Sequence, residues 1–274
     1  MMRSGERLRG SLITLMTWVL VLLFFFPVLW MAINAFKSEN DASSSTPLII
    51  FAPDLSGFEK LQERGMVDYL LNSLKAAGGA TVVIILLAIP AAYALSIRPV
   101  RKVQDSLFFF ISTRFMPIAA VALPLYMILK TLGALDSMWA LVLIYAAINL
   151  PIAVWMLRSF LMEVPIEIIE AARVDGAGFL REVTRIVIPL ILPGIAAAAL
   201  ICFIFAWNEY FLATLLTSDS ARTVPPFLGS FVDGRGQFLA VLSAAALVAA
   251  LPVIAAGWVA QKQLVRGLAL GAVK

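Results

Sequence analysis

The sequence has no histidine and only one cysteine, Cys202. Without histidine there is no histidine-dependent nucleophilic catalysis and no imidazole metal ligand, and one cysteine forms neither an intrachain disulfide nor a cysteine-based metal cluster. The chain also lacks the G-x-S-x-G turn of many hydrolases and the G-x-x-x-x-G-K-[ST] loop that cradles nucleotide phosphates. We therefore expect no catalytic residue, metal site or cofactor in this chain, and a lone Cys202 that is simply a small buried apolar residue. If ATP supplies energy, another subunit must bind it.

Charge is scarce as well. Charged residues make up 14% of the 274 residues, hydrophobic residues make up 62%, and the mean hydropathy is +0.96. A soluble domain cannot hide so much apolar surface, and several apolar runs approach the ~20 residues that span a bilayer. The sequence thus predicts a protein embedded in the lipid bilayer. The pI near 9.4 does not indicate nucleic-acid binding, because the cations lie beside apolar runs and form no basic domain.

Six apolar segments predict six transmembrane helices, at residues 11–36, 69–97, 106–129, 138–160, 186–216 and 237–261. The predicted fold class is therefore all-α, a polytopic membrane protein. The first segment follows Arg3, Arg7 and Arg9 and exceeds the ~7–15 apolar residues of a cleavable signal, so we interpret it as a retained signal anchor. Prolines in or beside the spans indicate bundled helices, since neighbours must satisfy the carbonyls that proline frees.

Positive charges set the predicted orientation. With the N-terminus inside, the cytoplasmic segments contain Arg3, Arg7, Arg9, Arg98, Arg101, Lys102, Arg158, Arg173, Arg181, Arg185, Lys262, Arg266 and Lys274. The outer loops then contain only Lys37, Lys60, Arg64, Lys130, Arg222 and Arg235. Because translocation is biased against Lys and Arg near span ends, this asymmetry predicts that both termini lie in the cytoplasm.

This topology divides the chain into three parts. Residues 1–68 hold the signal anchor and an outer loop, residues 69–262 form the membrane core with a cytoplasmic loop at 163–185, and residues 263–274 form a cytoplasmic tail. The outer loop at 37–68 is the longest and is acidic. Such a loop is either a solvated connection or a surface that meets a soluble partner.

The cytoplasmic loop has the pattern of two short amphipathic helices around a glycine turn. After Pro165, one face collects Ile166, Ile168, Ile169 and Ala172, and Gly176 then allows a left-handed stop. A second apolar arc follows, with Phe179, Leu180, Val183, Ile186 and Val187, while Arg181, Glu182, Thr184 and Arg185 lie opposite. This helix-turn-helix either rests on lipid or docks into a soluble protein.

The same loop carries a recognisable motif. "EAARVDGAG" at 170–178, followed by "IPLILPG" at 188–194, resembles the cytoplasmic EAA loop of permease subunits in binding-protein-dependent ABC importers. "FIFAWNEYFLATLLT" at 203–217 and "QKQLVRGLALGAVK" at 261–274 look like the fifth span and tail of the carbohydrate-importing, maltose-type branch. The resemblance covers nearly the whole chain, and the outer loop at 37–68 contributes least to it.

The resemblance implies a permease subunit in the bacterial cytoplasmic (inner) membrane that imports a sugar or sugar derivative. The implied partners are a second homologous permease subunit, two ATPase subunits that bind ATP and Mg²⁺, and an extracytoplasmic solute-binding protein. The helix-turn-helix is then a coupling loop, with the ATPase-coupling residues Glu170, Ala171, Ala172, Asp175 and Gly176. The C-terminal tail is expected to reach the ATPase interface.

Polar residues within the spans are candidates for the solute path, because ionisable groups in a bilayer are costly and usually face a cavity or a partner. Arg114 lies beside Met116 and Pro117. It either donates to carbonyls that Pro117 frees, pairs with the companion subunit, or contacts the solute. Asn149, before Pro151, serves either helix packing or transport.

The stretch "WNEY" in the predicted fifth span supplies four more candidates, Trp207, Asn208, Glu209 and Tyr210. Aromatic faces with amide and carboxylate groups suit a neutral polyhydroxylated solute. The two aromatic residues alternatively anchor the span at the membrane interface. The solute stays open at this point: an anionic derivative if Arg114 faces the pathway, and a neutral sugar or polyol if Arg114 pairs within the bundle.

Two other classes of function compete with the importer. In a membrane enzyme we would expect catalytic motifs, and "AARVDGAG" fails the signature of phospholipid alcohol transferases because it has one Asp and A-R precedes D-G. A secondary transporter should carry ion-coupling acids near the bilayer midplane, whereas the acids here lie mostly in loops or near span ends. Both are disfavoured against the importer subunit.

Overall fold

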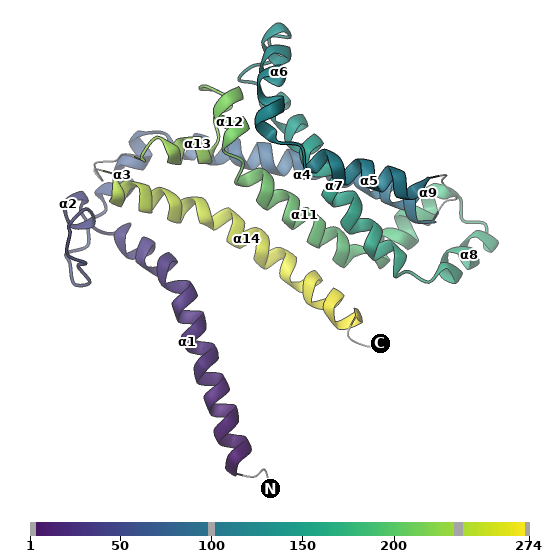
Figure 1. The fold of residues 1–274 in the computed structure, drawn as a ribbon, viewed down its shortest axis with the longest axis horizontal. Helices are drawn as coiled ribbons and strands as arrows, with labels where there is room; N and C mark the ends of the chain where they lie inside the picture. Colours follow the sequence, from purple (N-terminus) through teal and green to yellow (C-terminus); the bar gives the residue numbers. More distant parts are fainter. Residues whose placement is uncertain (1–3, 98–101, 233–237, 272–274) are drawn as a thin grey trace. The chain divides into compact units, whose positions relative to one another are not determined.

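The computed structural model describes residues 4–97, 102–232 and 238–271, and these residues form helices and no strands (Figure 1). In chain order the elements are α1 (Ser4–Asn34), α2 (Glu39–Ala42), α3 (Ser56–Glu63), α4 (Met66–Ile97), α5 (Val103–Arg114), α6 (Ile118–Thr131), α7 (Met138–Met162), α8 (Ile166–Val174), α9 (Phe179–Glu182), the π-helix η1 (Val183–Val187), α10 (Ile188–Leu190), α11 (Leu192–Trp207), α12 (Phe211–Leu216), α13 (Val224–Gly229) and α14 (Leu239–Gly271). The predicted all-α class is confirmed.

Four single helices are long and apolar enough to cross a membrane, namely Arg9–Asn34, Met66–Ile97, Met138–Met162 and Leu239–Gln263. Two bent pairs bring the number to six if each pair is one span. Val103–Arg114 meets Ile118–Thr131 at 83°, and Phe179–Leu190 meets Leu192–Trp207 at 78°. The third and fifth predicted spans are therefore broken, where hydropathy alone indicated continuous helices.

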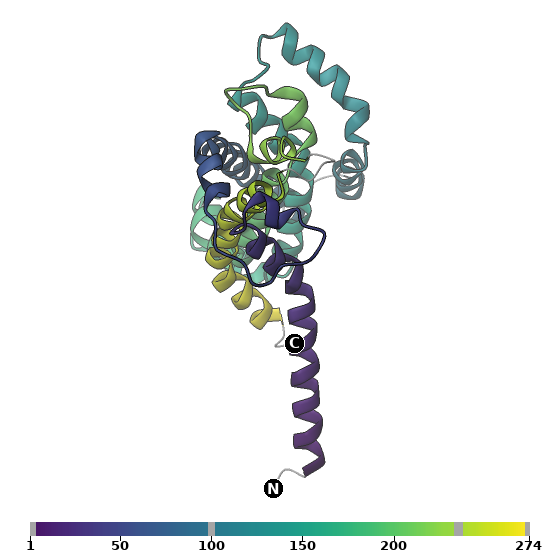
Figure 2. The ribbon, with the colours of Figure 1, turned by 90° about the vertical axis from the view of Figure 1, so that its left-hand side faces the viewer.

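Proline explains both breaks. Pro117 precedes α6 with an extended ψ of 121°, and a proline disfavours helical geometry at the residue before it, so α5 ends and α6 leaves at a steep angle (Figure 2). In the fifth span, Pro193 lacks the amide that would bond to the carbonyl of Pro189, and Ile191 between them has non-helical angles of −96° and 12°. Hydropathy averages over such single residues and does not detect them.

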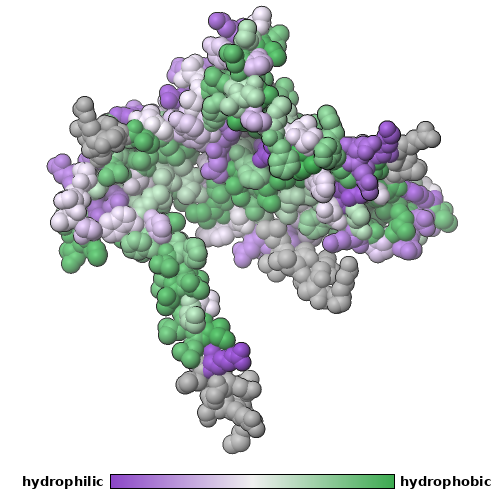
Figure 3. Space-filling view, in the orientation of Figure 1, coloured by the Kyte–Doolittle hydropathy of each residue, from purple (hydrophilic) through white to green (hydrophobic). Residues whose placement is uncertain are grey.

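The chain separates into two compact units, residues 1–66 with 228–250 and residues 67–227 with 251–274. In the first unit, the Glu39 carboxylate accepts hydrogen bonds from the amides of Ala240 (3.1 Å) and Val241 (3.4 Å) at the start of α14. Such an anion satisfies amides that a helix leaves unpaired at its N-terminus. The most apolar stretch of α1, also in this unit, has none of its residues buried in the protein and is largely green in the hydropathy view (Figure 3).

Small side chains build the core of the second unit. The buried residues of α4 are mostly alanines, namely Ala76, Ala77, Ala80, Ala88 and Ala92, and they belong to one cluster with buried residues of α7 and α11. Small residues let helices approach closely where lipid provides no hydrophobic driving force between them. Gly194 of α11 is the tightest such position, because an added Cβ would overlap the side chain of Phe160 on α7.

Two loops of the second unit are joined at Asp136, between α6 and α7. Its carboxylate accepts hydrogen bonds from the amides of Ser218 (3.0 Å), Asp219 (3.2 Å), Ser220 (2.9 Å) and Ala221 (3.0 Å), in the loop after α12. Partial burial acts to raise the pKa of Asp136, but these N–H donors outweigh it and hold the pKa well below the usual aspartate range.

The predicted cytoplasmic tail is not a separate segment in the described residues. Helix α14 continues without a break through Gly271, so residues 263–271 extend the last span. The rest of the predicted tail, residues 272–274, lies outside the described residues.

Candidate functional site

A cavity of about 660 Å³ lies where the third span breaks. Its lining comes from α5, α6, α7 and the end of α11, and consists of Thr113, Arg114, Met116, Ile118, Val121, Ala147, Ile148, Asn149, Phe205, Asn208 and Glu209. Four of the six solute-path candidates therefore meet in one place, namely Arg114, Asn149, Asn208 and Glu209. The break after Arg114 matters here, because a straight helix would not open the bundle at this level.

Arg114 is the last residue of α5 and reaches across to α7. Its Nη1 donates to the carbonyl of Ile148 (2.8 Å) and to Oδ1 of Asn149 (3.1 Å), and its guanidinium lies 5.1 Å from the centre of the Phe205 ring. Of the alternatives that the sequence left open for Arg114, a bond to carbonyls freed by Pro117 is not among these contacts. Pro151 instead frees a carbonyl on α7, that of Ala147, and Arg114 bonds to the next carbonyl along.

Asn149 is buried and held on both sides of its amide. Its Nδ2 donates to the carbonyl of Tyr145 (2.9 Å), while Oδ1 accepts from Arg114. The thiol of Cys202 lies 4.0 Å from the Asn149 carbonyl and is buried as expected. Asn149 thus packs helices and lines the cavity at the same time.

Asn208 and Glu209 follow the end of α11, so they do not continue the span as the sequence predicted. Asn208 folds back, and its Nδ2 donates to the carbonyl of Ile204 (2.8 Å). The carboxylate of Glu209 accepts from the amide of Leu212 (2.6 Å) at the start of α12. A carboxylate at a helix N-terminus is stabilised by the unpaired amides there, and this fixes Glu209 at the cavity edge.

The two aromatic residues of "WNEY" do not line the cavity. Trp207 is only 4% exposed and stacks on Phe203, so its interpretation as an interface anchor is wrong. Tyr210 is 50% exposed. The aromatic face in the cavity belongs to Phe205, which is not among the candidates predicted from the sequence. Helical spacing offered a signal, because Phe205 precedes Asn208 by three residues and Glu209 by four.

The predicted helix-turn-helix forms in the loop at 163–185. Helix α8 ends at Val174, and Gly176 has a φ of 80°, in the left-handed region that the sequence predicted for this glycine. Of the predicted coupling residues, Glu170, Ala171, Asp175 and Gly176 are exposed and Ala172 is half-buried. Beside them lie exposed apolar side chains, with Val174 at 88% and Leu180 at 73% exposure.

One prediction for this loop is wrong. The sequence places Glu182 on the polar side, opposite the apolar arc, where a charged side chain should reach solvent, but Glu182 is only 1% exposed. The residues after it adopt the π-helix η1, which shifts the helical register, so the arc expected from α-helical spacing no longer holds. Of the apolar arc, Val183 and Val187 are buried within the chain, whereas Phe179 and Leu180 are exposed and remain available to lipid or a partner.

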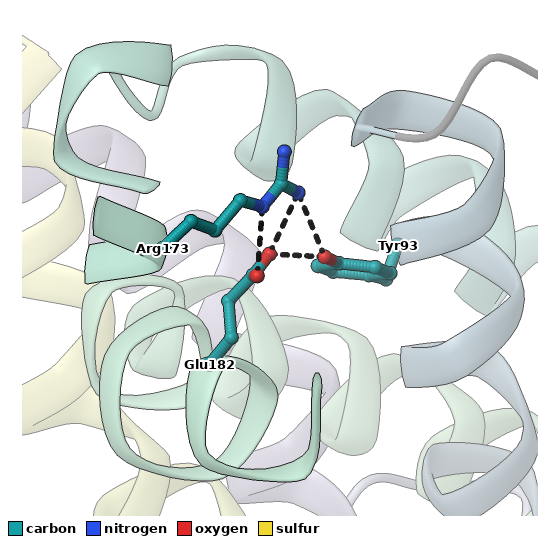
Figure 4. Close-up of polar contacts among 3 residues, drawn as sticks. All are labelled: Tyr93, Arg173 and Glu182. Atoms are coloured by element: carbon teal, nitrogen blue, oxygen red, sulfur yellow. Dashed lines mark hydrogen bonds and ion pairs between the residues drawn. The ribbon is translucent and has the colours of Figure 1, made fainter. Parts of the chain in front are cut away.

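Glu182 is buried among partners from two other segments (Figure 4). Nε and Nη2 of Arg173 on α8 donate to its carboxylate at 2.9 and 3.0 Å, and the hydroxyl of Tyr93 on α4 donates to the same carboxylate. The bonds to Glu182 and then to Tyr93 raise the pKa of Arg173. We call Tyr93, Arg173 and Glu182 the loop node.

Known proteins resemble this chain along almost its full length. The probable ABC transporter permease protein y4oR of Sinorhizobium fredii is 36% identical over 99% of this chain and 98% of its own. The maltodextrin transport system permease protein MdxG of Bacillus subtilis is 32% identical over 93% of each chain. These relatives are permease subunits of ABC transporters.

A solved structure shares the fold. It is a bacterial ABC transporter involved in the import of the acidic polysaccharide alginate, with a TM-score of 0.76 and 22% identity over 96% of this chain and 98% of that chain. Residues 84–268 match the family described as the binding-protein-dependent transport system inner membrane component. The chain therefore belongs to this family of multi-pass membrane permeases.

Proposed function

We propose that this chain is one of two permease subunits of an importer that moves a sugar or sugar derivative into the cytoplasm, driven by ATP hydrolysis on partner subunits. The cavity around Arg114 carries the proposal. It gathers a guanidinium, two amides, a carboxylate and an aromatic ring, which together provide hydrogen-bond donors and acceptors beside an apolar face. These groups match a sugar, whose hydroxyl groups donate and accept hydrogen bonds and whose ring has apolar faces that pack on aromatic side chains. The similarity to the maltodextrin transport system permease of Bacillus subtilis supports the same class of solute.

The charges in the cavity favour a neutral solute. Arg114 and Glu209 line the same space, so a cation and an anion offset each other there. One nitrogen of Arg114 is already bonded to Ile148 and Asn149 on α7. An anionic solute would meet the carboxylate as well as the guanidinium. A neutral sugar or polyol can instead donate to Glu209 and accept from Arg114.

Helices α8 and α9 are the proposed docking surface for an ATPase subunit. Exposed apolar side chains of this loop, among them Ile166, Ile168, Val174, Phe179 and Leu180, lie next to the exposed Glu170 and Asp175. An amphipathic helix commonly lays such a face into a groove of its partner. The motif resemblance of residues 170–178 supports an ATPase as the partner over lipid.

The proposed setting is the bacterial cytoplasmic membrane, with both termini and the loop at 163–185 on the cytoplasmic side. The distribution of Lys and Arg between loops supports this orientation. The other proposed partners are a second permease subunit and an extracytoplasmic solute-binding protein. The family description, which names binding-protein dependence, supports the last of these.

Reconstitution in proteoliposomes tests the proposal. The chain is purified with its companion permease, two ATPase subunits and the solute-binding protein, and uptake of a labelled sugar is measured with and without ATP. We expect uptake only with ATP, and none when the phosphate-binding lysine of the ATPase is replaced. Uptake by this chain alone, without the ATPase, would overturn the proposed function.

The solute is identified on the solute-binding protein. A thermal-shift screen should include neutral sugars, polyols, acidic sugars, amino acids, peptides and metal ions, since a ligand at 100 times its Kd adds about 2.7 kcal/mol to stability. We expect neutral sugars or polyols to raise the melting temperature. A shift with acidic sugars alone would contradict the neutral assignment, and a shift only with amino acids, peptides or metal ions would overturn the carbohydrate class while leaving the permease assignment intact.

A further inference from the structure

The loop node joins segments that are far apart in the chain. Tyr93 lies in the last turns of α4, Arg173 lies near the end of α8, and Glu182 is the last residue of α9. All three meet at one carboxylate that is almost completely shielded from solvent (Figure 4). The node is therefore a polar cross-link between the loop at 163–185 and the end of a membrane-spanning helix.

The turn between α8 and α9 is poorly suited to hold α8 by itself. Gly176 and Gly178 lie in it, and neither has a neighbouring atom within 4 Å of where a side chain would begin. Glycine-containing turns with no packing around them are compliant. The side chains that fix α8 to the rest of the second unit include the buried Ile169 and the node member Arg173.

Buried charged hydrogen bonds resist separation more than apolar contacts do. If α8 moved away from α4 and α9, the buried Glu182 carboxylate would lose both hydrogen bonds from Arg173, and leaving a buried charge without its counter-ion is costly. An apolar contact such as that of Ile169 can slide with little loss, because it has no required direction. The node thus makes α4 follow a displacement of α8, whereas an apolar contact alone would let the two helices slide past each other.

A second contact continues the path from α4. Two residues beyond Tyr93, the carbonyl of Leu95 accepts a hydrogen bond from Nε of Arg158 on α7 (3.4 Å). Helix α7 also carries Asn149 and Ile148, the partners of Arg114 at the cavity. Hydrogen bonds between the helices, together with the rigid backbones of α4 and α7, thus connect α8 to the cavity.

We propose that Tyr93, Arg173 and Glu182 are positioning residues that make α8 and α4 move as one body, so that displacement of the loop by the ATPase reaches the cavity. This role rests on the proposed importer function. Without the node, the ATPase can still dock and hydrolyse ATP. The displacement of α8 then only bends the turn around Gly176 and does not reach α4, so solute transport becomes uncoupled from hydrolysis.

The test compares Tyr93→Phe and Glu182→Gln with the wild type in the complete complex in proteoliposomes, and measures solute molecules transported per ATP hydrolysed. Tyr93→Phe removes one hydroxyl and keeps the ring that contacts Phe179 edge-on at 5.5 Å. Lys75→Gln is the control, since Lys75 is an exposed charge on α4, the helix that carries Tyr93, and lies outside the proposed docking surface and the cavity lining. The amount of assembled complex is determined for each variant by size-exclusion chromatography.

We expect transport per ATP to fall at least about fivefold in Tyr93→Phe and Glu182→Gln, because one hydrogen bond to a buried charge shifts an equilibrium by about tenfold or more. Hydrolysis and assembly should stay within about twofold of wild type, and Lys75→Gln should keep the wild-type ratio. The double variant should lose no more than the larger single loss, since both changes act on one carboxylate.

A purely structural role would lower assembly, hydrolysis and transport together and leave the ratio unchanged. An unchanged ratio in Tyr93→Phe, the variant least able to disturb folding, would overturn the proposal even if Glu182→Gln failed to assemble. A wild-type complex without ATP-dependent uptake would overturn the proposed function, and the role of the node with it. An altered ratio in a working complex bears on the node alone.

Discussion

Asp136 accepts hydrogen bonds from four consecutive backbone amides of another loop. Its backbone has a φ of 55°, in the left-handed region, and its carboxylate faces a run of amides from residues 218–221. Amides that converge on one point form a site for an anion, and here the chain fills that site with its own side chain. Asp136 therefore fixes the loop after α12 to the loop after α6.

Asp136→Asn should destabilise this junction by about 1–2 kcal/mol, because the amide group of asparagine turns a donor toward backbone donors. Asparagine tolerates the left-handed backbone, so the effect reports on the carboxylate. Thermal unfolding of the solubilised protein measures it, with Asp219→Asn as control, since the Asp219 side chain is exposed. Equal melting temperatures for wild type and Asp136→Asn at pH 7 would contradict the assignment.

The effect should depend on pH with a definite sign. The pKa of Asp136 is lowered in the folded state, so the carboxylate stabilises the fold above the unfolded aspartate pKa of about 3.9, and this contribution is lost as pH falls further toward the folded pKa. The difference in melting temperature between wild type and Asp136→Asn should thus be full near neutral pH and shrink below about pH 4. A difference that grows on acidification would contradict this account.

At Gly194, the close packing of α11 on α7 requires a residue without a side chain. Gly194→Ala should force Phe160 or the α7–α11 contact to shift, with a cost of about 1–3 kcal/mol. Gly257→Ala in α14 is the control, because a Cβ there meets no atom within 4 Å and alanine favours helix. The melting temperatures of the two variants are compared with that of the wild type. A Gly194→Ala protein as stable as wild type would contradict the close approach of α11 to Phe160 of α7.

At the scale of elements, the sequence predicted two kinds of feature: the positions of the spans, which follow from hydropathy averaged over many residues, and turns set by a single residue type. Counting each bent pair as one span, hydropathy located five of the six spans to within a few residues, whereas the fifth runs over 179–207 and not over the predicted 186–216. Gly176 marked its left-handed turn because that backbone favours glycine. The breaks at Pro117 and Ile191 were missed, since prolines also occur inside unbroken helices of this chain, such as Pro90 of α4. Whether a proline bends or breaks a helix depends on neighbours that one sequence does not reveal.

In the candidate site, too, some features were predictable from the sequence and others were not. Costly polar groups in apolar segments singled out Arg114, Asn149, Asn208 and Glu209, and these four line one cavity. Their partners were not predictable, because Arg114 bonds to a main-chain carbonyl of α7 and carbonyls carry no sequence signal. The burial of Glu182 was hidden for a related reason, since the π-helix that follows it changes the period on which the prediction depended.

The turn between α8 and α9 yields an element-scale prediction. Gly176→Val should strain the left-handed backbone by about 1 kcal/mol or more and displace α8 from its position. Recovery of the ATPase with the permease in an affinity pull-down, and transport, should both fall. Gly178→Ala is the control, because Gly178 has an ordinary φ of −70°. Full recovery and transport in Gly176→Val would count against docking through this loop.

At the scale of the whole molecule, α14 links the two compact units and continues through Gly271. A truncation that removes residues from Gly267 onward should leave membrane insertion intact, because the apolar span ends at Gln263. Coupled transport should fall by about twofold or more if the last turns of α14 contact the ATPase, because the truncation then removes part of the binding energy between permease and ATPase. Uptake by proteoliposomes, normalised to the amount of inserted protein, is the measurement. Wild-type uptake would mark these residues as dispensable.

The isolation of α1 has a consequence for how the protein is made. Among the described residues of the first unit, none buries the most apolar stretch of α1, and a helix satisfies its own backbone hydrogen bonds, so lipid can accommodate it before later segments are synthesised. A segment of this kind can leave the ribosome, enter the translocon and partition sideways into the bilayer while residues beyond 66 are still untranslated. The alanine-rich α4 differs, because part of its surface is completed only by α7 and α11, which emerge much later. Membrane integration of this chain should therefore begin with an independent first step and end with a cooperative one.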